Sequence, residues 1–240
     1  MTISVRILGT RSPYPVAGAP CSGYLVNTPD ALVLLDLGLA VWPELTRDVA
    51  PGSLTAIWIS HLHPDHSADL LAAYQWAANT ANTPRLPIYG PPGWSQRLAA
   101  FLPTSDSARQ IHRYFEVHEH GVDTTIRWEN TTLTAIPVKH SVPTWGARLA
   151  HDGATVAYSA DSGPCEAIET LADGADLFIC EAGSANPGSD YHSTPEDAAH
   201  AGRLAKRILL THLAQELAPA DASHRAHGAH VAVPGQRFTI

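Results

Sequence analysis

The sequence predicts an α/β (α+β) fold in which two β-sheets pack face to face and helices cover them. Strand patterns occur in both halves of the 240-residue chain, and helix patterns follow several of them. About 45% of the residues are apolar, which supplies a sizeable core and excludes a disordered chain. No linker, repeat or low-complexity tract divides the sequence, so we expect a single domain over residues 1–240.

The first half predicts paired strands that lead into a cluster of histidines. Ile3 to Leu8 alternates apolar and polar residues, as an opening strand does. A helix is expected at about 68–78, where apolar residues recur at helical spacing, and another near 94–101. The other expected strands are Tyr24 to Val26, Ala31 to Asp36, Ala56 to Ile59 and Leu86 to Tyr89.

The second half repeats this style and adds one well-marked helix start. Thr194 is the expected N-cap, because Pro195 occupies the first helical position and Asp197 lies three residues past the cap. A short helix is expected over 164–172. The expected strands lie near 111–118, 124–128, 131–138, 146–150, 154–159, 176–180 and 208–210.

Charge and cysteine content exclude several classes of protein. The chain has 15 Lys+Arg against 23 Asp+Glu, a net charge of −8, so its average field repels polyphosphate and anionic membranes. Three cysteines are too few for a disulfide framework or a four-thiolate zinc site. No signal peptide and no apolar run of roughly 18 residues is apparent. We therefore expect a cytoplasmic protein without a membrane partner.

The segment His61-Leu-His-Pro-Asp-His66 carries the strongest chemical signal. It begins where a buried strand ends and runs into a helix. His61 and His63 project to the same side of an extended segment, and Asp65 and His66 face a second point. Imidazoles with a carboxylate match the ligand preference of zinc. Further candidate ligands each follow an apolar strand, at His140, Asp161 and His212, so the chain offers enough ligands for two metal ions.

These motifs resemble those of the metallo-β-lactamase superfamily, and within it the ribonuclease Z and related phosphodiesterase branch. The similarity covers nearly the whole chain and implies a four-layer αββα sandwich of two mixed sheets flanked by helices. The motifs that carry it, besides the histidine segment, are Gly9-Thr-Arg-Ser-Pro13, Leu34-Leu-Asp-Leu-Gly38, Tyr89-Gly-Pro-Pro-Gly93, His140, Tyr158-Ser-Ala-Asp-Ser162, Glu181-Ala-Gly183, His192-Ser-Thr194 and Thr211-His-Leu213.

The resemblance implies two Zn²⁺ ions, although Mn²⁺ or Fe suits the same donors. It makes Asp161 a bridge between the ions, where zinc β-lactamases of the commonest subclass carry a cysteine, so β-lactamase activity is not expected. It also makes Asp36 a buried carboxylate that steadies the metal loop. The implied ligands are His61, His63 and His140 for one ion, and Asp65, His66 and His212 for the other.

The resemblance also implies a metal-dependent hydrolase whose ions activate a water molecule. His192, in a His-x-Thr motif and supported by Glu181, is then the general acid that protonates the leaving group. The expected catalytic residues are therefore His192, Glu181 and Asp65. Members of the branch are often dimers, so a homodimer is implied by the resemblance alone.

A small phosphodiester, such as a cyclic nucleotide or nucleotide-like ester, is the expected substrate. The Gly/Pro- and Lys-rich arm with which ribonuclease Z enzymes grip tRNA is not visible, and two lysines in an acidic chain give large RNA little affinity. The alternatives are a tRNA 3′-end endoribonuclease, an ester or lactone hydrolase on the same metals, and a non-catalytic metal-binding scaffold. Candidate substrate contacts are Trp145, Arg148, Tyr191 and Arg11.

Overall fold

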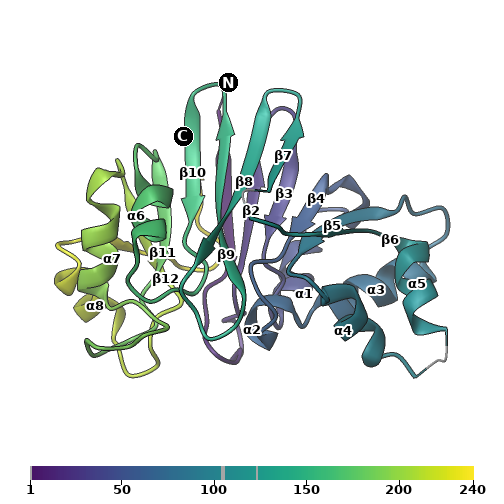
Figure 1. The fold of residues 1–240 in the computed structure, drawn as a ribbon, viewed down its shortest axis with the longest axis horizontal. Coiled ribbons are helices and arrows are strands. Elements are labelled where there is room, and N and C mark those ends of the chain that lie inside the picture. Colours follow the sequence, from purple (N-terminus) through teal and green to yellow (C-terminus); the bar gives the residue numbers. More distant parts are fainter. Residues whose placement is uncertain (1, 104–105, 123) are drawn as a thin grey trace.

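Two mixed sheets, each of seven strands, lie face to face, and helices cover both outer sides (Figure 1). The computed structural model describes residues 2–103, 106–122 and 124–240. The four-layer αββα prediction is confirmed by this arrangement. No helix within those ranges has the length and apolar character needed to cross a bilayer.

The first sheet has the strand order β14-β1-β2-β3-β4-β5-β6. The β14–β1, β1–β2 and β2–β3 pairs are antiparallel, whereas β3 to β6 run parallel to one another. The strands are β1 (Ser4–Gly9), β2 (Gly23–Asn27), β3 (Leu32–Leu35), β4 (Ala56–Trp58), β5 (Leu86–Gly90), β6 (Phe115–Glu119) and β14 (Arg237–Thr239).

The second sheet has the order β13-β12-β11-β10-β9-β8-β7. Here β7 to β10 are antiparallel, and β10 to β13 are parallel. The strands are β7 (Thr125–Trp128), β8 (Thr131–Val138), β9 (Thr144–His151), β10 (Ala154–Tyr158), β11 (Leu177–Glu181), β12 (Ile208–Thr211) and β13 (His230–Val231).

The helices divide between the two outer faces. Figure 1 shows α3, α4 and α5 on the side of the first sheet and α6, α7 and α8 on the side of the second. The α-helices are α1 (Val41–Leu45), α2 (Pro64–Ser67), α3 (Leu70–Asn79), α4 (Trp94–Ala100), α5 (Ser107–Tyr114), α6 (Glu166–Ala172), α7 (Pro195–Ala201) and α8 (Pro219–Arg225). Two 3₁₀ turns lie at Pro51–Ser53 and Gly202–Leu204.

Strand periodicity sorts the apolar side chains into separate cores. Successive residues of a strand point to opposite faces. In β3, Val33 and Leu35 therefore pack between the sheets, while Leu34 packs under the helices of the first face. In β11, Ile179 packs between the sheets and Phe178 packs under the helices of the second face. Strands buried on both sides explain why their sequences read as continuous apolar runs.

The predicted strand near 111–118 is wrong in its first half. Residues up to Tyr114 belong to helix α5, and the strand begins at Phe115. The capping prediction at Thr194 is confirmed, because its side chain accepts from the backbone N–H of Asp197, and the Asp197 carboxylate accepts from the backbone N–H of Thr194. Part of the segment in which no RNA-binding arm was visible, residues 104–105, lies outside the described residues.

One buried histidine of the core makes stability depend on pH. His120 is 3% exposed, its Nε2 bonds to the Ile59 carbonyl at 2.8 Å, and its Nδ1 has no hydrogen-bond partner among the described residues. Burial disfavours the charged ring and lowers the pKa of His120 to about 4. Between pH 6.5 and 4 the unfolded chain therefore takes up a proton that the folded chain does not, and stability falls as the pH drops through that window.

We expect His120→Gln to remove this part of the acid sensitivity. On going from pH 7 to 4.5, the free energy of unfolding should fall by about 2 kcal/mol less in the variant than in the wild type. Urea unfolding at both pH values measures the difference. His118→Gln, at an exposed position of β6 two residues earlier, is the control. Equal pH sensitivity of wild type and His120→Gln would contradict the assignment.

Candidate metal centre

The predicted metal ligands meet at one end of the sandwich, where several strands finish. His61 comes shortly after β4, and His63 is the N-cap of α2, which carries Asp65 and His66. The other three follow strands of the second sheet, His140 after β8, Asp161 after β10 and His212 after β12. Residues far apart in the sequence are thus brought together by the ends of the two sheets.

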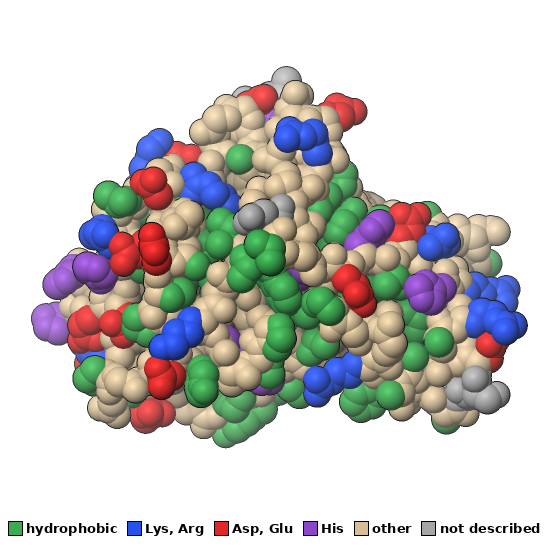
Figure 2. Space-filling view, in the orientation of Figure 1, with side chains coloured by type: hydrophobic (Ala, Val, Ile, Leu, Met, Phe, Trp, Pro, Cys, Tyr) green, Lys and Arg blue, Asp and Glu red, His purple; other side chains and the backbone are tan. Residues whose placement is uncertain are grey.

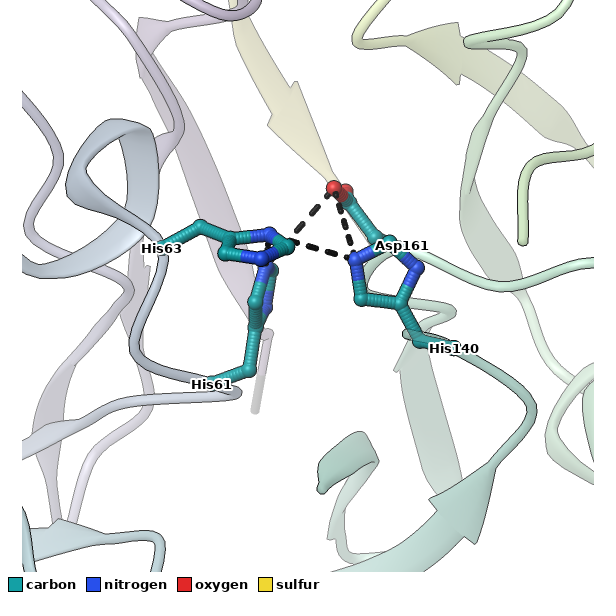
Figure 3. Close-up of side chains that lie close together, drawn as sticks. All are labelled: His61, His63, His140 and Asp161. Atoms are coloured by element: carbon teal, nitrogen blue, oxygen red, sulfur yellow. Dashed lines mark hydrogen bonds and ion pairs between the residues drawn. The ribbon is translucent and has the colours of Figure 1, made fainter. Parts of the chain in front are cut away.

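The first group consists of His61, His63, His140 and Asp161, whose ligand atoms all lie within 4.8 Å of one another (Figure 3). His63 Nδ1 is 3.1 Å from His61 Nε2 and 3.2 Å from His140 Nε2. Asp161 Oδ2 lies 3.7 Å from His61 Nε2 and 3.9 Å from His140 Nε2. Three ring nitrogens and a carboxylate oxygen therefore face a common point.

The second group consists of Asp65, His66 and His212. His212 Nε2 lies 3.2 Å from Asp65 Oδ2 and 3.3 Å from Asp161 Oδ2. Asp161 Oδ1 lies 3.2 Å from His66 Nε2. Asp161 therefore faces both groups, which is the position required of a bridging ligand.

The donor set fits divalent cations. Burial lowers the pKa of His61, His63 and His140, which favours the neutral ring that binds metal. His66 Nε2 and Asp161 Oδ1 are buried and 3.2 Å apart, yet neither forms a hydrogen bond with the other or with any other described atom. Orphaned buried polar atoms are costly in an interior unless something else satisfies them. The two His/Asp groups are thus able to bind metal.

Asp36 bonds to the loop that carries the candidate metal ligands His61 to His66. It follows β3, is fully buried, and accepts from the Ser60 N–H at 2.7 Å and the Ser60 hydroxyl at 2.8 Å. The same carboxylate lies 2.7 Å from His66 Nδ1 and accepts from the Tyr158 hydroxyl at 2.8 Å. The sequence indicated a role for Asp36 but none for Ser60 or Tyr158. Strand alternation gives the face on which a side chain lies, but it does not show which polar side chains of two sheets meet.

We expect Asp36→Asn to weaken metal binding while the fold is kept. The amide retains the size of the side chain but not the negative charge that orients His66, and such supporting groups are typically worth 10–100-fold in metal affinity. Competition with a chromogenic chelator measures the change. Asp173→Asn, at an exposed position, is the control. Unchanged affinity would show that Asp36 does not act through His66.

The backbone beside these side chains is strained at three positions. Asp36, Ala160 and His212 have φ values of 60°, 56° and 50°, in the left-handed region that non-glycine residues seldom occupy. Each lies directly after a strand or beside a proposed ligand. Such strain persists where surrounding contacts over-determine it, and it concentrates at functional sites.

His192 lies against the metal-binding groups and is held by Glu181. His192 Nδ1 is 3.1 Å from Glu181 Oε1, and the ring stacks on that of His212 with centroids 5.7 Å apart. A Cβ at Gly183 would lie 2.8 Å from His192 Nδ1, so this close approach requires glycine. Burial opposes protonation, but the hydrogen bond and charge of Glu181 outweigh it and raise the pKa of His192 to about 9.

The predicted substrate contacts are placed in different surroundings. Tyr191 is 49% exposed, and its ring lies 6.2 Å from that of His140, at the edge of the centre. The structure does not bring Trp145 or Arg148 to the candidate metal centre. Trp145 is buried in the core between the sheets and donates from Nε1 to the Gly121 carbonyl. Arg148 donates to the Leu171 carbonyl of α6 at 2.7 Å. The ring of Trp145 is therefore part of the core, and its contact with substrate stays a prediction.

The larger of two described pockets is not where the charged groups meet. It has a volume of about 480 Å³ and an apolar lining that includes Leu62, Pro64, Trp94 and Phe101. None of the proposed metal ligands lines it. The chemistry is therefore assigned to the His/Asp groups and not to this apolar pocket.

Comparisons with known proteins identify the family of the chain and agree with its fold. The family model described as "Beta-lactamase superfamily domain" matches residues 30–213. The uncharacterized protein ML1173 of Mycobacterium leprae is 31% identical over 260 residues, which cover 100% of this chain and 89% of that protein. A protein named ribonuclease Z from Mycobacterium sp. strain KMS is 31% identical over 256 residues, covering 95% and 90%.

A solved structure extends the agreement to the whole fold. The metallo-β-lactamase fold protein YhfI from Bacillus subtilis superposes with a TM-score of 0.85 at 25% identity, and the match covers 100% of both chains. The matched family, the two stacked sheets and the His/Asp groups at their end lead to one conclusion. The chain belongs to the metallo-β-lactamase superfamily and is a hydrolase of that fold.

Proposed function

We propose that the protein is a phosphodiesterase that uses two Zn²⁺ ions to cleave a small nucleotide-like phosphodiester or cyclic nucleotide. The observation that carries the proposal is the position of the His192–Glu181 pair beside two converging groups of metal donors. Cleavage of an ester with a poor leaving group requires a general acid close to the metal ions that activate water.

The residues that would hold the ions divide as the two groups do. His61, His63 and His140 would bind one ion, Asp65, His66 and His212 the other, with Asp161 facing both. When bound, two such cations lower the pKa of water toward about 7 and offset charge that develops on phosphoryl oxygens. A pair of cations held there would favour in-line displacement at phosphorus.

His192 then moves a proton to the leaving oxygen. Glu181 fixes the ring through Nδ1, so Nε2 is the atom that transfers the proton. Glu181 is itself held, because Oε1 accepts from the N–H groups of Ser162 and Ser193 at 3.0 and 3.1 Å. The carboxylate is therefore rigid, and the acid is positioned before substrate binds.

Surface charge favours a substrate of modest size over large RNA. On the face shown in Figure 2, basic and acidic side chains are interspersed and no broad basic patch is visible. With a net charge of −8, the chain would gain little from release of RNA counterions. The relative named ribonuclease Z keeps tRNA 3′-end cleavage as the second candidate.

The test combines metal analysis with turnover of a panel of substrates. We expect two metal ions per chain and hydrolysis of bis(p-nitrophenyl) phosphate and of a cyclic nucleotide, with no hydrolysis of nitrocefin. Cleavage of precursor tRNA in preference to the small esters would select the second candidate. Hydrolysis of a lactone alone would overturn the phosphodiester proposal. Absence of metal would favour the alternative of a non-catalytic scaffold.

A further inference from the structure

The metal-facing histidines differ in what holds their outer nitrogen. Histidines that bind metal through one nitrogen almost always donate the other N–H to an acceptor. Three have a partner: His61 Nδ1 lies 3.0 Å from the Ser60 hydroxyl, His66 Nδ1 2.7 Å from Asp36, and His140 Nδ1 2.8 Å from the Tyr191 carbonyl. His212 Nδ1 is buried and has no partner among the described residues.

A small pocket is lined in part by His212. Its volume is about 150 Å³, and His212 and Arg11 both contribute to its lining. Arg11 Nε is also buried without a hydrogen-bond partner in the part of the chain that the structure describes. One small pocket therefore has two residues with orphaned nitrogen atoms, and the charge of one of them is permanent.

The pocket walls are fixed by contacts between two loops. The His212 N–H donates to the Thr10 carbonyl at 3.1 Å, and the Tyr14 hydroxyl donates to Gln215 Oε1 at 3.2 Å. Gln215 Nε2 in turn donates to the Ser12 carbonyl at 3.4 Å. Because three hydrogen bonds tie residues 10–14 to residues 212–215, the pocket is preformed.

We propose that this pocket is a binding site for a small oxyanion, a phosphate, sulfate or carboxylate group, which accepts hydrogen bonds from Arg11 Nε–H and His212 Nδ1–H. No aspartate or glutamate is among the described residues that line the pocket, so nothing there neutralises the guanidinium. Two donors, one of them charged, suit an anion better than a water molecule, which brings no compensating charge. A volume of about 150 Å³ also exceeds the roughly 30 Å³ that one water occupies in the liquid.

The site would orient His212 toward the proposed metal. An anion bound at Nδ1–H fixes the tautomer whose Nε2 lone pair faces Asp65 and Asp161. Arg11 is thus a positioning residue that acts through the anion on His212. The inference rests on the proposed metal role of His212, but it does not depend on which ester the enzyme cleaves.

Sulfate and selenate titrated into the metal-loaded protein test the site directly. We expect calorimetry to detect a sulfate-binding event whose dissociation constant rises at least about tenfold in Arg11→Met, the loss typical of one charge-assisted hydrogen bond. Arg11→Lys, which keeps the charge but lacks the guanidinium Nε–H, should recover part of the binding. Arg47→Met, at an exposed arginine, is the matched control and should bind as the wild type does.

A crystal of the wild-type protein soaked in selenate gives a readout that requires no variant. Anomalous scattering between Arg11 and His212 would support the proposal. A water molecule alone in that pocket, or selenate at the His/Asp groups only, would overturn it, as would equal sulfate affinity of wild type and Arg11→Met. Failure of phosphodiester turnover would leave all these binding results unchanged, so the two proposals fail separately.

Discussion

Replacing Asp161 by alanine is expected to remove metal and hydrolytic activity together. Its two carboxylate oxygens face His66 on one side and His61 and His212 on the other, so one substitution opens both groups. We expect metal content to fall from two ions per chain to one or none. Turnover should drop by at least about 10³-fold, the equivalent of several kcal/mol of lost transition-state stabilisation.

The measurement is metal analysis by mass spectrometry after gel filtration, together with phosphodiester turnover. Asp161→Asn keeps the volume of the side chain but replaces one carboxylate oxygen by an NH2 group, so loss of metal from both variants identifies the charged pair of oxygens as the requirement. Asp173→Asn should retain two ions. Full retention of two ions by Asp161→Ala would show that Asp161 does not bridge them.

The candidate metal ligands were the residues that the sequence predicted best. Spacing within one short segment predicts four of them, and position at a strand end predicts the other three. Four of the predicted ligands, Asp65 among them, lie within one strand-to-helix turn, where their spacing alone places them side by side. His140, Asp161 and His212 could be anticipated because each ends an apolar strand, and strand ends are where side chains from different parts of a sheet meet. Their convergence on a common point is what the structure adds.

Periodicity failed where the chain lacks a strong apolar pattern. Helix α5 has the sequence SARQIHRY and buries only Ile111, so no apolar stripe marks it as a helix, and the expected strand near 111–118 includes its last four residues. Helices α1 and α8 and the short strands β13 and β14 were missed because each is only two to seven residues long. Such elements depend on tertiary contacts more than on local sequence.

Trp145 and Arg148 show why substrate contacts are hard to predict from sequence position. Both lie in β9 a few residues after His140, and proximity in sequence suggested contact with substrate. A strand, however, advances about 3.3 Å per residue and alternates its faces. Trp145 therefore points into the core between the sheets, and Arg148 points to the opposite face, toward α6. A sequence position near a ligand says little until the strand direction and face are known.

Replacing His192 by alanine is expected to leave metal content unchanged. Turnover should fall most for substrates whose leaving group must be protonated as it departs. With an alkoxide leaving group, as in a nucleotide phosphodiester, the loss should be about 10²–10⁴-fold. With p-nitrophenolate, a leaving group that departs without a proton, the loss should be much smaller. Turnover of both substrates by each protein, with metal analysis, measures this. His200→Ala, an exposed histidine of α7, is the matched control.

The contrast between the two substrates separates proton transfer from metal binding. The ligand atoms of His192, Asp161 and His212 also lie within 4.8 Å of one another, so the ring is close enough to be a ligand itself. A ligand would lose metal on substitution and impair both substrates equally, because each depends on the same cations. An acid would keep the metal and impair only the substrate whose leaving oxygen must be protonated. The hydrogen bond from His192 Nδ1 to Glu181 is the geometry of an oriented acid, which is why we expect the second result.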